Sequence, residues 1–221
     1  AVGVDVLGLG QSPGAGANHD DLPWLYATRQ RPPRVAAGIG CSAPVGFQLI
    51  RTPMKILEFL CQRPDGLGHL TDDERESAIN FALLYMYFEA HLVNTKTNAD
   101  TLKRLAARLA GVGSVEVQGV LQCYEYFRNR YWGGAEPTQY VYGLRMSNAL
   151  ADEILPLLAN SPDAYGKLVA CLLIILRYRN NLFHGTKWKY GLEGQKENFD
   201  QSTQLLLAVI ALDDAANGNA N

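Results

Sequence analysis

The chain has few cysteines, and their spacing forms no recognisable motif. The four of them among 221 residues are Cys41, Cys61, Cys123 and Cys171, with no Cys-x-x-Cys pair. This scatter is typical of a reducing compartment, and the first residues also lack the basic start and long apolar core of a secretory signal. We therefore expect a cytoplasmic location, with Cys171 serving as a small buried hydrophobe.

Long apolar runs, strand-like alternation and an excess of one charge are also missing. The longest apolar stretch is far shorter than the roughly 20 residues that cross a bilayer, so no membrane partner is expected. A net charge of −2 argues against a protein that coats nucleic acid indiscriminately. Because apolar residues do not alternate with period two, the sequence predicts an all-α protein.

Metal and nucleotide motifs are absent as well. His19, His69 and His91 have no ligand-like neighbours at useful spacing, so no metal site is expected. The Gly8-Leu9-Gly10 stretch lacks both the third glycine of a dinucleotide-binding turn and the Gly-Lys ending of a phosphate loop. We accordingly expect no cofactor.

Residues 1–45 are rich in glycine, alanine and proline, which predicts a loop-rich or partly disordered arm.

Residues 46–221 are expected to form one helical bundle. Within it, Thr71 and Glu74 have the spacing of a capping box, and the helix they open should present Ile79, Leu83, Tyr87 and Ala90 along one face. The predicted helices span residues 46–62 (with a kink at Pro53), 71–93, 99–110, 114–131, 138–158, 162–184 and 199–215.

The helix over 162–184 is the most apolar of these. Ser161 is predicted to cap it, Pro162 to take the first helical position and Gly185 to end it. At 100° per residue, Arg179 follows the apolar stripe, whereas Arg177, Asn180, Asn181 and His184 gather on the other side. An arginine on an apolar stripe has a simple structural explanation, which is that it reaches solvent or pairs with a carboxylate from a neighbouring helix.

The end of this helix carries the segment Arg179-Asn180-Asn181-Leu182-Phe183-His184-Gly185. It resembles the signature of the HEPN superfamily, in which arginine, four to six residues and histidine end a long helix of an all-α bundle. The resemblance covers about seven residues in sequence and residues 71–215 in architecture. It implies a metal-independent endoribonuclease that works as a homodimer.

Under this resemblance the catalytic residues are Arg179, His184 and Asn180. Histidine moves protons near neutral pH, and arginine is a permanent cation that clamps phosphate oxygens. RNA would be cleaved by attack of its 2′-hydroxyl, leaving a 2′,3′-cyclic phosphate and a 5′-hydroxyl. One chain supplies a single histidine, and Arg179 and His184 point about 140° apart on an ideal helix. We therefore expect a composite site in a homodimer formed through the motif helix, with the stripe that bears Arg179 at or near the interface.

Further residues near the motif are candidates for contact with RNA. Residues 160–190 carry five lysines and arginines against Asp163, a balance of +4, whereas residues 191–221 carry Lys196 against five acidic residues, a balance of −4. The residues predicted to bind substrate are Arg177, Asn181, Lys187, Trp188 and Lys189. Residues 128–132 also mix arginines with aromatics, but packing at a helix end explains them better than base stacking does.

Two alternatives to the nuclease stay open. The first is a non-catalytic dimer of the same family type that binds RNA, a nucleotide or a partner protein, and the second is an unrelated helical interaction protein. Nuclease members of the superfamily occur in phage defence and in toxin systems, some controlled by a partner protein. Some toxin members carry a tyrosine two residues after the histidine. Threonine stands at that position here, which weakens the case for a partner that modifies the tyrosine.

Overall fold

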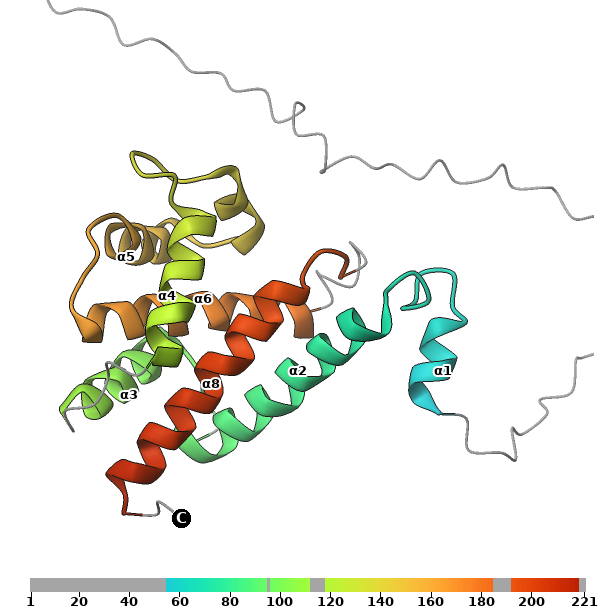
Figure 1. Cartoon of the computed structure of the whole chain (residues 1–221), viewed down its shortest axis with the longest axis horizontal. Helices are drawn as coiled ribbons and strands as arrows, with labels where there is room; N and C mark the ends of the chain where they lie inside the picture. The colour runs from blue at the N-terminus through green and yellow to red at the C-terminus, as the bar shows by residue number, and fades with distance from the viewer. Residues whose placement is uncertain (1–54, 95, 112–117, 185–191, 219–221) are drawn as a thin grey trace, which may run out of the picture. The chain divides into compact units, whose positions relative to one another are not determined.

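The computed structural model describes residues 55–94, 96–111, 118–184 and 192–218. These residues belong to one compact unit, residues 50–221, and they are mostly helical (Figure 1). Apart from one antiparallel bridge between Trp132 and Pro137, they contain no strand, which confirms the all-α prediction. The helices are α1 (Ile56–Cys61), α2 (Asp72–Leu92), α3 (Ala99–Gly111), α4 (Gln118–Tyr131), the 3-10 helix η1 (Gln139–Leu144), α5 (Asn148–Ala159), α6 (Ala164–Phe183) and α8 (Lys196–Ala216). The predicted arm over 1–45 lies outside the described residues.

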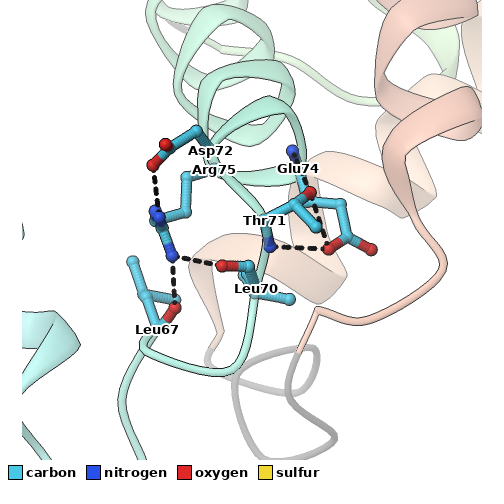
Figure 2. Close-up of polar contacts among 6 residues, drawn as sticks. All are labelled: Leu67, Leu70, Thr71, Asp72, Glu74 and Arg75. Atoms are coloured by element: carbon cyan, nitrogen blue, oxygen red, sulfur yellow. Dashed lines mark hydrogen bonds and ion pairs between the residues drawn. The ribbon is translucent and has the colours of Figure 1, made fainter.

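Helix α2 begins at the predicted capping box (Figure 2). The Thr71 Oγ1 accepts a hydrogen bond from the Glu74 backbone N–H at 3.2 Å, and the Thr71 N–H donates to Glu74 Oε2 at 3.0 Å. Arg75 fixes the preceding turn, because its guanidinium donates to the carbonyls of Leu67 and Leu70 and pairs with Asp72. Both hydrogen bonds of the predicted capping box are therefore present, and they fix the first turn of α2.

Helix α6 is the centre of the bundle. Every residue from 168 to 176 is buried, and the helix packs against α3, α4, α5 and η1. Helix α8 lies alongside α2 and also contacts α4 (Figure 1). The apolar stripe of α6, represented by Leu172, Ile175 and Leu176, therefore lies in the chain's own core. These three residues are not available for the expected dimer contact, whereas Phe183 at the end of the same stripe is 48% exposed.

The predicted start of α6 was wrong by two residues. Ser161 has φ of 45°, so it does not have the extended backbone of an N-cap. Asp163 caps the helix instead, with its Oδ1 accepting from the Gly166 N–H at 2.8 Å. A Cβ on Gly166 would lie 2.6 Å from the Cβ of Pro162, so glycine is what lets the proline fold back over the first turn.

The single helix predicted over 138–158 was also wrong. The segment forms η1 and α5, separated by Arg145 in the left-handed conformation with φ of 51°. Ser147 then starts α5 by accepting a hydrogen bond from the Leu150 N–H at 3.3 Å. This break matters for the candidate site, because it turns the last carbonyls of η1 towards α6.

The face of α2 that was predicted from periodicity is the exposed one. Ile79, Leu83 and Tyr87 are 40–61% exposed. The buried positions of the helix are Ser77, Ala78, Phe81, Tyr85 and Phe88. Phe81 stacks on Phe199 of α8 with ring centroids 5.2 Å apart, so α8 covers this second face. Both faces of α2 are apolar, and the first is left without cover among the described residues.

A polar network joins α4, α6 and α8 inside the core. The hydroxyls of Tyr126 and Tyr178 donate to Asn198 Oδ1 at 2.8 and 3.0 Å, and Tyr178 also bonds the hydroxyl of Tyr131. Burial raises the pKa of Tyr131 to about 12, so its hydroxyl stays neutral. The network ties the motif helix to its two neighbours through a single amide oxygen.

We expect Asn198→Ala to lower the free energy of unfolding by about 2–3 kcal/mol, because two tyrosine hydroxyls lose their acceptor in a buried site. Urea unfolding measures the loss. Gln204→Ala, at an exposed position of the same helix, is the matched control and should change stability by less than about 0.5 kcal/mol. Equal stability of the two variants would contradict a structural role for the network.

Candidate functional site

The side chain of Arg179 points from the end of α6 towards α2. Its Nη2 lies 3.2 and 3.1 Å from the two carboxylate oxygens of Glu89, and its Nη1 donates to Asn180 Oδ1 at 3.2 Å. The Arg179 and Glu89 side chains are 28% and 19% exposed. The structure therefore confirms the simple explanation that this arginine pairs with a carboxylate from a neighbouring helix.

Aromatic rings flank the same guanidinium. Its central carbon lies 5.8 Å from the ring centroid of Tyr85 and 5.4 Å from that of Phe183. Tyr85 is buried, and burial raises the pKa of its hydroxyl. The Arg179 Nε is buried without a hydrogen-bond partner among the described residues. Arg179 thus lies at the edge of the core, held by one carboxylate and two rings.

Sequence reasoning did not identify Glu89. An acidic residue ninety positions before the motif has no fixed spacing to it, so no motif could point to it. One signal was available: residues 77–88 contain no charged side chain, and Glu89 is the first charge after them. A lone charge at the end of an apolar helical stretch requires a partner when it is partly buried.

His184 takes the C-cap position of α6 and is exposed. Its backbone N–H donates to the carbonyl of Asn180 at 3.0 Å, while its imidazole has no hydrogen bond, ion pair or ring contact with the described part of the chain. Within one chain, the described residues therefore form no side-chain link between Arg179 and His184. Asn180 links them indirectly, since its side chain bonds Arg179 and its carbonyl accepts from His184.

Arg177 and Asn181 lie together on another side of α6. Arg177 donates to the carbonyls of Leu144 and Arg145 at 3.0 and 2.6 Å, and Asn181 Nδ2 reaches the carbonyls of Gly143 and Leu144 at 3.3 and 3.4 Å. Burial lowers the pKa of the Arg177 guanidinium. Both side chains therefore fasten the end of η1 to α6, and their contact with substrate stays a prediction.

We expect Arg177→Ala to lower the free energy of unfolding by about 1–2 kcal/mol, because the Leu144 carbonyl keeps only the longer bond from Asn181 and the Arg145 carbonyl loses its bond from the guanidinium. Chemical denaturation checks this, with Arg104→Ala as the control, since Arg104 is exposed on α3. If the two variants were equally stable, the anchoring role of Arg177 would be wrong.

The remaining predicted residues divide into two groups. Lys187, Trp188 and Lys189 lie outside the described residues. In the segment 128–132, Arg128 donates to the Leu158 carbonyl at 3.1 Å, and the Arg130 guanidinium lies 4.6 Å from the Tyr140 ring centroid. These contacts support the interpretation that this segment packs the end of α4.

Comparison of the chain with protein-family models, curated proteins and solved structures yields no match. Within the described ranges, histidine, cysteine and acidic side chains form no group of three or more that could hold a metal ion. No described helix is both long enough and apolar enough to span a membrane.

Proposed function

We propose that the chain is a metal-independent endoribonuclease of the HEPN type, with His184, Arg179 and Asn180 as its catalytic residues. One observation carries the proposal. An exposed imidazole ends α6 one turn after an arginine–asparagine pair that is held in a fixed orientation. A proton carrier and a fixed cation are the groups that this reaction needs.

In the proposed reaction the 2′-hydroxyl of RNA attacks the adjacent phosphorus. A base removes the hydroxyl proton, the bond from phosphorus to the 5′-oxygen breaks, and an acid protonates that oxygen. Imidazole can fill either role near neutral pH. Arg179 would stabilise the charge that collects on the phosphorane oxygens through its N–H groups.

The ion pair with Glu89 limits how many N–H groups of Arg179 can bind a phosphate. The two Glu89 carboxylate oxygens both accept from Nη2, and Asn180 Oδ1 accepts from Nη1. Arginine has five N–H donors; with Nη2 facing Glu89 and Nε buried, the second N–H of Nη1 is the one that stays open to a phosphate. In this proposal Glu89 is a positioning residue that holds Arg179 in place.

The second proton-transfer group would come from a second copy of the chain. Two copies related by a two-fold axis would each contribute a motif to a composite cleft. The control by a protein partner that phage-defence and toxin members show would then act on this assembly. These biological settings are part of the proposal and follow from the resemblance in sequence.

The Arg179–Glu89 pair also favours a second candidate function. A guanidinium already paired with a carboxylate contributes less to phosphate binding than a free one does. A non-catalytic dimer that binds RNA, a nucleotide or a partner protein would need His184 only as a surface contact. The two candidates differ in whether RNA is cut.

The test is to incubate the purified chain with mixed RNA in EDTA and to identify the fragment ends. The nuclease predicts fragments with 2′,3′-cyclic phosphate and 5′-hydroxyl ends. Intact RNA that nevertheless shifts in a binding assay would support the non-catalytic candidate. Fragments with 3′-hydroxyl and 5′-phosphate ends would contradict the proposed chemistry.

A further inference from the structure

The exposed side of α2 carries a continuous apolar stripe. Ile79, Leu83, Met86 and Tyr87 are 40%, 61%, 55% and 50% exposed, and Ala90 is exposed next to them. Their spacing of three and four residues places them in one row on the helix surface. We call this row the outer face of α2. Contiguous exposed apolar rows of this kind mark interaction sites in proteins that are otherwise well packed.

The middle of α2 lacks charge on every side. Residues 77–88 contain no aspartate, glutamate, lysine, arginine or histidine. An uncharged helical stretch in which an exposed amide, Asn80, is flanked by apolar residues on both sides is typically covered on more than one face. Helix α8 covers one face of α2, with Phe81 stacked on Phe199. The composition therefore fits a second cover over the outer face.

The charged residues near the two ends of α2 indicate that the cover is the same helix of a second copy. Asp73 and Glu76 are exposed at the first turns, whereas His91 is exposed in the last turn and Lys96 is exposed four residues beyond the end of α2. When α2 of a second copy runs antiparallel across the outer face, the acidic end of each helix meets the basic end of the other. The helix dipoles are then also opposed. A parallel arrangement would place acid against acid.

The spacing of the stripe suits a two-fold axis at Leu83. Ile79 and Tyr87 are each four residues from Leu83, so an antiparallel pair brings Ile79 of each copy to Tyr87 of the other. The same register places Glu76 close to His91 across the axis. His91 packs on Tyr87 with ring centroids 4.3 Å apart, so the apolar row ends at His91.

The outer face lies beside the candidate site. Glu89, which holds Arg179, is the immediate neighbour of Ala90. Phe183, 48% exposed, contacts the same guanidinium. We infer that the outer face of α2 is the surface through which two copies of this chain pair, antiparallel and centred on Leu83. This inference rests on the homodimer of the proposed function, but it requires no cleavage. In this register the two Glu89 residues lie about 18 Å apart along the helices, so the pairing by itself does not bring the two motifs into one cleft.

The first test is sedimentation velocity of the full chain at increasing concentration. We expect a dimer for the wild type and for Leu207→Glu, which alters an equally aliphatic exposed position on α8. Leu83→Glu should raise the dimer Kd at least about tenfold, because it places two carboxylates at the centre of the contact. Circular dichroism checks that Leu83→Glu stays folded. A monomeric wild type, including one whose outer face is covered by its own residues 1–54, overturns the inference, as does an unaltered Leu83→Glu dimer.

Disulfide trapping tests the direction of the pairing. In a background with Cys41 and Cys61 replaced by serine, Leu83→Cys should form a covalent dimer under mild oxidation. Glu76→Cys should not, since the two positions would lie about 21 Å apart along antiparallel helices at 1.5 Å per residue. A covalent dimer of Glu76→Cys would overturn the antiparallel arrangement. Loss of RNA cleavage with an intact dimer would count against the proposed function alone.

Discussion

Replacement of His184 by alanine is expected to lower the rate of RNA cleavage by a factor of about 10²–10⁴, the usual contribution of a general acid or base. The imidazole is exposed and makes no hydrogen bond, ion pair or ring contact with the described residues, so its loss should leave the fold intact. Alanine also keeps the backbone N–H that caps α6 at Asn180. RNA affinity should fall little, because the group acts on protons in the transition state.

Single-turnover cleavage and fluorescence anisotropy with labelled RNA separate the two effects. His69→Ala, at an exposed position outside the candidate site, is the control and should cut at the wild-type rate. Unchanged cleavage by His184→Ala would mean that another group moves the protons. A parallel loss of affinity and cleavage would instead indicate a binding role for the imidazole.

Replacement of Arg179 by alanine should lower cleavage by about 10²–10³ through loss of charge stabilisation on the phosphorane. It should also lower the free energy of unfolding by about 1–3 kcal/mol, because the partly buried Glu89 carboxylate loses its partner. The two effects have different causes. They can therefore be separated by a second substitution.

The double variant Arg179→Ala with Glu89→Gln removes the unpaired charge. We expect it to regain most of the lost stability, since a neutral amide is less costly to bury than a carboxylate. Cleavage should stay as low as in Arg179→Ala. Urea unfolding and cleavage rates of the four proteins in this cycle provide the measurement. Recovery of cleavage together with stability would show that Arg179 acts only through the fold.

Features set by a few neighbouring residues were predicted well from the sequence. The capping box at Thr71 and Glu74 specifies its own geometry, and so the start of α2 was correct. The start of α6 was misplaced because serine and aspartate both cap helices, and Pro162 packs against Gly166 rather than taking the first helical position. The break at Arg145 was missed because the left-handed residue itself is neither glycine nor asparagine, and Gly143, two residues before it, was not interpreted as a break.

Features that depend on a distant partner were not predictable in this way. Periodicity found an apolar row on α2, but the helix has two such rows, and only the contact of Phe81 with Phe199 decides which one is buried. The residues next to Arg179 in the sequence include no acidic side chain that could pair with it. The counterion proved to be Glu89, which tertiary packing brings to it.

The most direct test of the account compares two RNA oligonucleotides that differ in a single 2′-hydroxyl at the cleaved nucleotide. If that hydroxyl is the nucleophile, the all-RNA strand is cut there to a 2′,3′-cyclic phosphate, and the 2′-deoxy strand binds but stays intact at that bond. Equal cutting of both strands would contradict the mechanism. Failure to cut either strand, with binding retained by both, would favour the non-catalytic candidate.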